Sequence, residues 1–351
     1  MDFPAEHHLR RLATHAGAHA AVDFACFYVL FARFSPFVQP AEQLTLGFLL
    51  YNVLAFGLQP LIGFLCDHYR SFPAAAAGCA LVLVGLCLPQ GAAWAALVLC
   101  AFGNAWFHVG AGSDVLLLSH GRMADNGAFV ATGAVGVALG TLAGQNGVSA
   151  ALPIVLLSAV LLLLWWMPTQ FGGALTRYWI FSGRTGLPLA FFLLLLAVAA
   201  RSFAGAVMPA PWRSTGDYLL LAAGAAALGK ALGGVLADVF GARRVSVLAL
   251  ALSVPLLALF YESPALSAIG LVLFNIPMPV TLCAVADLLP YNPGLAFGLT
   301  TLALLVGVVP VFLVPLAGAS AAALAAALSA LAAGCLLVVT RNRRDVYHET
   351  V

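Results

Sequence analysis

The sequence predicts an all-α membrane protein whose twelve transmembrane helices form two pseudo-symmetric six-helix bundles. Three observations carry this prediction. Only 8% of the residues are charged and 63% are hydrophobic, whereas a soluble domain carries roughly 25% charged residues. The apolar residues gather into segments that can cross a bilayer as helices. The two halves of the chain also repeat one another, as expected of a membrane fold built from internal repeats.

Twelve apolar segments follow one another along the chain, and most of the links between them are short. They cover residues 15–36, 43–66, 73–89, 92–114, 127–148, 151–168, 187–210, 217–237, 245–261, 264–288, 294–316 and 319–340. The longest link carries Arg177 and Arg184 and leaves six segments on each side. The predicted domains are an N-terminal bundle (1–168), a cytoplasmic linker (169–186) and a C-terminal bundle with a short cytoplasmic tail (187–351).

Arginine predicts the orientation in the membrane, because cytoplasmic loops carry an excess of basic residues. With an even number of spans, both termini share a side. On that side fall Arg10, Arg11, Arg70, Arg122, Arg177, Arg184, Arg243, Arg244, Arg341, Arg343 and Arg344. The opposite side holds only Arg33 and Arg213. We therefore expect the protein in the inner membrane of a bacterium, with both termini in the cytoplasm.

Composition also excludes several classes of function. A net charge of +2 with scattered arginines does not make a nucleic-acid surface. The seven cysteines show no paired spacing, so we expect inert thiols rather than a disulfide framework or a metal site. No nucleophile–base motif predicts an enzyme, and no cofactor is expected. Membrane lipid, protons and a small-molecule substrate are the expected partners of a monomer.

The two halves repeat at an offset of 171 residues (238 − 67). The matched pairs are Gly63 and Gly234, Asp67 and Asp238, Asn104 and Asn275, Gly127 and Gly298, and Gly136 and Gly307. Under this offset Lys230 corresponds to Gln59, so the halves present different chemistry at equivalent places. Repeated halves of this kind are typical of proteins whose binding site lies between them near the membrane midplane.

Lys230 is the only lysine of the chain, and it stands inside an apolar run. At 1.5 Å per residue it lies about 12 Å from Asp238, which ends that run. A buried charge at such depth costs about 2.5–3.5 kcal/mol or more, and therefore indicates a partner or a ligand. Arg201 is a second cation of this half, and its side chain could instead snorkel to the interface. The predicted substrate-binding residues are Lys230, Arg201, Gln59, Asn104, His108 and Asn275.

The first segment carries His15, His19 and Asp23 at successive i, i+4 positions, hence on one helix face. Histidine titrates near neutral pH, so His19 and Asp23 are predicted to form a proton-coupling pair. Two alternatives stay open: Asp23 forms a salt bridge with Arg201 or Lys230, or the three side chains bind a metal ion. In the fourth segment Asn104 and His108 share a face, for substrate contact or for interhelical hydrogen bonds.

Two loops carry the same polar motif and resemble the signature loop of the major facilitator superfamily of transporters. The motif residues are Gly63, Asp67 and Arg70 in the first half and Gly234, Asp238, Arg243 and Arg244 in the second. Further motifs resemble the fosmidomycin-resistance-like branch of that superfamily. They are His19-x3-Asp23, Phe107-His108 with Gly110, the glycine series from Gly127 to Gly144, and Arg201-Ser202.

The resemblance implies the major facilitator fold and alternating access. It implies a proton-coupled secondary transporter, and the buried cations favour a small organic anion as its substrate. The glycine series resembles the antiporter motif of exporters, so export is expected. Alternatives are proton-coupled uptake of an organic anion, transport of a metal or metal chelate through His15, His19 and Asp23, and a membrane sensor or scaffold that transports nothing.

Overall fold

The computed structural model describes residues 5–69, 71–167, 187–214, 216–312 and 316–339, and these residues contain helices and no strand. The helices before the predicted linker are α1 (Ala5–Val29), α2 (Ala41–Asn52), α3 (Gln59–His68), α4 (Ala74–Cys87), α5 (Ala93–Leu118), α6 (Met123–Gln145) and α7 (Ala151–Trp165). Those after it are α8 (Leu187–Val207), α9 (Gly216–Phe240), α10 (Ala242–Leu259), α11 (Pro264–Asn275), α12 (Pro277–Leu288), α13 (Pro293–Val308) and α14 (Gly318–Val339).

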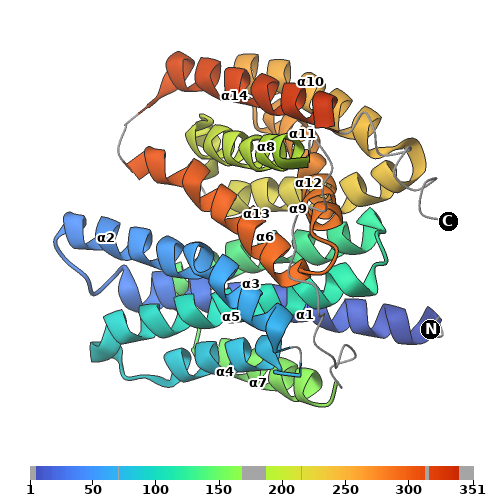
Figure 1. Ribbon diagram of the computed structural model, residues 1–351. Coiled ribbons are helices and arrows are strands. Elements are labelled where there is room, and N and C mark those ends of the chain that lie inside the picture. Colours follow the sequence, from blue (N-terminus) through green and yellow to red (C-terminus); the bar gives the residue numbers. More distant parts are fainter. Residues whose placement is uncertain (1–4, 70, 168–186, 215, 313–315, 340–351) are drawn as a thin grey trace.

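Ten helical segments of the described chain are long and apolar enough to cross a membrane. Two shorter apolar helices, α4 and α7, complete the predicted twelve segments. The chain is therefore a multi-pass integral membrane protein. The start of α1 and the end of α14 lie toward the same side of the molecule (Figure 1), as an even number of spans requires.

Proline divides two of these spans into shorter helices. The span 41–68 changes to a π-helical turn, Val53–Gly57, just before α3, whose second residue is Pro60. The span 264–288 breaks between α11 and α12, at Pro277. Proline has no N–H to give to the preceding turn, so the helical hydrogen bonding must change register there.

Two large hydrophobic cores lie one in each half of the chain, and a smaller cluster with Met123, Ala237 and Cys283 joins α6, α9 and α12. Phe34, Phe107 and Phe129 are fully buried in the first core, and Leu194 and Leu250 in the second. The first core also includes two residues from the second half, which join the halves. The predicted linker lies outside the described residues, so the domain boundary at 169–186 stays a prediction.

The halves meet where α3 packs on α13 and α6 packs on α9 (Figure 1). Glycine makes both crossings close. A β-carbon at Gly127 would lie 2.7 Å from the backbone oxygen of Lys230, and one at Gly298 would overlap the backbone of Gln59. These contacts are equivalent under the 171-residue offset. The glycines of α6 serve a second contact, since Gly136 and neighbouring glycines pack on the backbone of α1.

Candidate functional site

Four buried polar side chains converge in the N-terminal half, and we call them the polar cluster: His19 and Asp23 of α1, Asn104 and His108 of α5. The Asp23 carboxylate lies 3.3 Å from His19 Nε2 and 3.6 Å from His108 Nε2. Asn104 Nδ2 donates a hydrogen bond to Asp23 Oδ1 over 3.0 Å. The predicted pair of His19 and Asp23 is thus in contact, and Asn104 and His108 join it.

Backbone carbonyls fix the tautomer of both histidines. His19 Nδ1 lies 2.8 Å from the carbonyl oxygen of Phe129, and His108 Nδ1 lies 2.9 Å from that of Asn104. A carbonyl oxygen only accepts, so each Nδ1 carries a hydrogen and donates it. In a neutral ring this leaves each Nε2 with a lone pair. The two Nε2 atoms nevertheless lie 2.9 Å apart, beside the carboxylate.

The surrounding helices hold the polar cluster tightly. The ring centre of Phe129 on α6 lies 4.5 Å from that of His19, with the rings tilted by 30°, and the ring centre of Phe107 on α5 lies 6.3 Å from it. On α6, a β-carbon at Gly133 would overlap His19 Nε2 and lie 2.7 Å from Asp23 Oδ2. Gly133 therefore gives the cluster its room. Sequence patterns singled out neither Gly133 nor the carbonyl of Phe129, because both lie on a helix distant in the chain.

Two lone pairs and a carboxylate this close need a shared positive charge. A proton between the nitrogens meets that need at a separation of 2.9 Å. Two nitrogen ligands of a tetrahedral zinc ion, at about 2.0–2.1 Å from the metal, would stand roughly 3.3 Å apart. His19, Asp23 and His108 also offer one ligand atom each within 4.8 Å of one another, which is close enough to hold a metal ion. The alternative metal set, His15 with His19 and Asp23, does not converge, because His15 Nε2 faces Asp114 instead.

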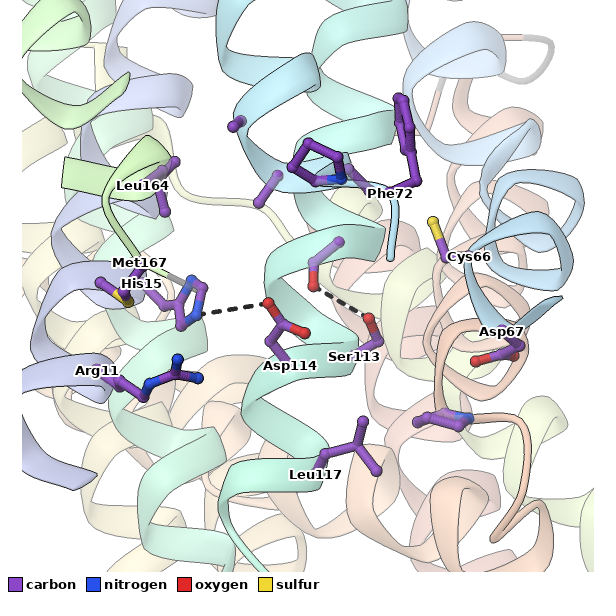
Figure 2. A pocket seen from close by; sticks show the side chains of 16 residues that line it. Arg11, His15, Cys66, Asp67, Phe72, Ser113, Asp114, Leu117, Leu164 and Met167 are labelled. Carbon is purple, nitrogen blue, oxygen red and sulfur yellow. Dashed lines mark hydrogen bonds and ion pairs between the residues drawn. The ribbon is translucent and has the colours of Figure 1, made fainter. Parts of the chain in front are cut away.

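His15 points into a separate cavity of about 60 Å³. Figure 2 shows His15 and Arg11 of α1 facing Asp114 of α5 across it. His15 Nε2 lies 3.7 Å from Asp114 Oδ2. Asp67 and Cys66 of α3 line the same cavity.

The C-terminal half contributes two cations, Arg201, which is buried, and Lys230, which is half-buried. Arg201 of α8 is 7% exposed, so its side chain does not snorkel outward. Its Nη2 donates to the backbone oxygen of Phe274 at 3.0 Å, and its guanidinium carbon lies 5.4 Å from the centre of the Phe274 ring. Lys230 of α9 interacts electrostatically with Asp23 and with Arg201. Within the described residues, neither cation forms an ion pair with a carboxylate, so the alternative of a salt bridge to Asp23 is not formed.

Two further predicted substrate residues have local hydrogen bonds. Gln59 is fully buried, and its Nε2 donates to the backbone oxygen of Ala55 at 2.6 Å. Asn275 donates to the backbone oxygen of Leu271 at 2.8 Å. Asn275 also packs against Gly229, next to Lys230. Their contact with a substrate stays a prediction.

The two signature loops cap helices of the opposite half. Asp67 accepts hydrogen bonds from the backbone nitrogens of Gly294 (2.9 Å) and Leu295 (2.8 Å) at the start of α13. Asp238 accepts from the backbone nitrogens of Met123 (2.9 Å) and Ala124 (2.8 Å) at the start of α6. Each donor pair is displaced by 171 residues from the other (294 − 123, 295 − 124), so the caps are reciprocal.

The glycines of these loops belong to the same contacts. A β-carbon at Gly63 would overlap the backbone of Gly294, and one at Gly234 would overlap that of Met123. Arg243 is half-buried and Arg244 is exposed at the start of α10. Arg70 lies outside the described residues.

No family profile matches the sequence, and no curated protein matches it. Solved structures do match. A crystal structure of the E. coli fucose:proton symporter FucP shares 14% identity, covers 96% of this chain and 99% of its own, and has a TM-score of 0.68. The same transporter in its outward conformation gives 14% identity, coverage of 95% and 98%, and a TM-score of 0.64. The human organic anion transporter MFSD10 gives 16% identity, coverage of 96% and 100%, and a TM-score of 0.68.

The chain has the major facilitator fold. The predicted fold class is confirmed, with its six-plus-six arrangement of apolar segments. At these identities the likeness concerns the fold alone, and no comparison confirms the fosmidomycin-resistance-like branch.

Proposed function

We propose that this protein is a secondary active transporter that carries a small organic anion together with a proton by alternating access. The major facilitator fold supports transport in general. The similar structures belong to a fucose:proton symporter and an organic anion transporter, which is consistent with proton coupling and with an organic anion as the substrate. The observation that carries it is the contact of two imidazole Nε2 atoms at 2.9 Å beside Asp23.

The polar cluster is the proposed proton site. Both rings donate through Nδ1, so one additional proton is what two facing Nε2 lone pairs can share. With that proton, one imidazolium charge balances the Asp23 carboxylate and the cluster is neutral. Without it, the carboxylate keeps its full charge in a buried place, which is costly unless a cation compensates.

Lys230 is the cation within electrostatic reach of Asp23. When the cluster loses its proton, Lys230 compensates the carboxylate. When the cluster is protonated, Lys230 and Arg201 are left with a positive charge that only an anion can balance. Proton and anion therefore favour each other's binding. A sensor or scaffold would instead be expected to pair its buried charges permanently, which neither cation does in the described structure.

When proton and anion favour each other's binding, the two are carried in the same direction, which is symport. Under an inward proton gradient it drives uptake, so we propose uptake in place of the export that the glycine series predicts. The contacts of these glycines give no reason for either direction, because they join α6 to α1 and α9 as close packing in any transporter would. A single chain supplies both halves of the site, so we propose a monomer.

Flux in proteoliposomes tests this function. Radiolabelled lactate, succinate, citrate and benzoate serve as probes, with fucose as the neutral comparison, under an imposed pH gradient. We expect one of the acids to accumulate with the gradient in the wild type, and Asp23→Asn to abolish accumulation. The matched control is Asp287→Asn, which removes an exposed carboxylate from the end of α12 and should transport normally.

Two outcomes would contradict the proposal. Accumulation that persists in Asp23→Asn would remove the polar cluster from coupling. Anion flux in the wild type that is indifferent to the pH gradient would exclude proton coupling altogether.

A further inference from the structure

We propose that His15 and Asp114 form a proton relay between the polar cluster and the water at the N-terminal end of α1. The inference rests on the proposed function, since it supplies the route for the proton that the cluster binds. The route runs through the small cavity of Figure 2, which is lined mainly by residues of the N-terminal half.

The positions of the two residues support a relay. His15 lies one turn before His19 on α1, and β-carbons four residues apart on a helix are about 5–6 Å apart. The His15 side chain is 5% exposed, whereas that of Asp114 is 37% exposed. The imidazole is therefore enclosed, and the carboxylate 3.7 Å away reaches water. Together they lead from the turn of α1 that precedes His19 to the surface.

The two nitrogens of His15 have different surroundings. Nε2 faces the Asp114 carboxylate, so it is the nitrogen that carries the hydrogen in the neutral ring. Nδ1 is buried and has no hydrogen-bond partner. Leaving a buried polar atom without a partner costs about 1–3 kcal/mol. The Nδ1 lone pair is therefore the proposed acceptor of the proton that leaves the polar cluster.

The transfer balances in protons and charge. The N–H bond at Nε2 of the protonated His19 breaks as a new N–H bond forms at Nδ1 of His15, through one bridging water molecule. The His15 imidazolium then releases its Nε2 hydrogen to the Asp114 carboxylate, which passes it to water. The ring is left with its hydrogen on Nδ1, and it returns to the starting tautomer when Nε2 takes a proton from water and Nδ1 releases its hydrogen to water.

Other groups around His15 are consistent with this role. Arg11 interacts electrostatically with Asp114 and so favours its return to the carboxylate after the proton leaves. The side chains that α7 and α13 contribute to the cavity are apolar. The titratable and charged groups that line it are Arg11 and His15 from α1, Cys66 and Asp67 from α3, and Asp114 from α5. Asp67 also caps α13, so the relay opens beside a contact between the halves.

Proton release after a pH jump separates the relay from the proton site. Purified protein in nanodiscs is mixed with alkaline buffer, and pyranine reports released protons in a stopped-flow instrument. The phase that belongs to the polar cluster is identified by its loss in Asp23→Asn and in His108→Gln. We expect Asp114→Asn to keep the amplitude of this phase and to slow it at least about a hundredfold, the low end of what a positioned side chain contributes to proton transfer.

The variants separate the possible outcomes. His15→Gln should slow the same phase, Asp114→Glu should restore its rate, and the exposed control Asp287→Asn should leave it unchanged. Thermal unfolding confirms that each variant is folded. A wild-type rate in both Asp114→Asn and His15→Gln would overturn the relay while leaving the proton site intact. A phase that persists in Asp23→Asn would overturn the proton site, and the relay with it.

Discussion

Breaking one reciprocal cap should open the molecule on the side that is predicted to be cytoplasmic. Asp238 holds the start of α6 through two backbone hydrogen bonds. Asp238→Asn keeps one carbonyl acceptor and turns the other into an amide donor that faces an N–H group. The variant therefore loses about one hydrogen bond to a charged acceptor, which contributes roughly 1.5–3 kcal/mol. At 1.4 kcal/mol per tenfold, the open population should rise roughly 10- to 150-fold.

Cys283 reports on this opening without a new label site. It is 2% exposed and packs in a small cluster with Met123 of α6 and Ala237 of α9, across the contact that Asp238 caps. In a background with no other cysteine, its reaction with N-ethylmaleimide should accelerate by that factor in Asp238→Asn. Asp67→Asn should act in the same direction, because the two caps close the same side.

Cys79 supplies the control. It is fully buried within the N-terminal half, where its thiol faces the backbone oxygen of Leu157 at 3.7 Å. Separation of the halves does not expose it, so its reactivity should be the same in wild type and variants. Equal acceleration at Cys79 would indicate unfolding instead of opening. An unchanged rate at Cys283 in Asp238→Asn would refute the idea that the caps hold the closed state.

Three further results are expected. Lys230→Met should abolish the thermal stabilisation by the transported acid while the protein stays folded, and Lys230→Arg should restore it only in part, since a planar fork replaces a point charge. Gly133→Ala should lower the unfolding temperature through overpacking of about 1–3 kcal/mol, whereas Gly17→Ala, with nothing within 4 Å of the new methyl, should not. Single cysteines at Ser71 and Ser263 should react with an impermeant maleimide from inside and outside, respectively.

Much of the fold was predictable because its signals are local in the chain. The apolar segments and the repeated loop motif can each be recognised without knowing which helices touch. The 171-residue offset even anticipates the reciprocal caps, since Asp67 and Asp238 are equivalent and their donors are equivalent too. The two short helices, α4 and α7, were also predictable as spans, because the apolar segments that contain them, 73–89 and 151–168, are longer than the helices themselves.

The polar cluster was predictable only in part. Residues four apart share a helix face, so the contact of His19 with Asp23 follows from the sequence. Each step of four residues still rotates the side chain by about 40° around the helix axis, because a helix has 3.6 residues per turn. His15 is therefore rotated away from Asp23 and meets Asp114 instead. The contact of Asp23 with Asn104 spans 81 residues and depends on how α1 and α5 dock, which no local pattern encodes.

The surroundings of Arg201 were not predictable from the sequence. Its position along the helix left open a side chain that reaches the interface, but the guanidinium is buried and donates to the carbonyl of Phe274 at the end of α11. The last carbonyls of a helix have no partner within it, and α11 stops just before Pro277. The proline was the available signal: a helix break inside an apolar span marks backbone groups that can accept from a buried cation.

The equivalence of Gln59 and Lys230 gives the proposed coupling its physical basis. The backbone of each residue contacts a glycine of the opposite half, Gly298 for Gln59 and Gly127 for Lys230. The backbone packing is therefore equivalent on the two sides of the pseudo-symmetry axis. Their side chains differ, and so do the charges around them. The N-terminal half holds a carboxylate with two histidines, and the C-terminal half holds two cations without a carboxylate partner in the described structure. A proton bound at the polar cluster therefore alters the charge balance between the carboxylate of one half and the cations of the other.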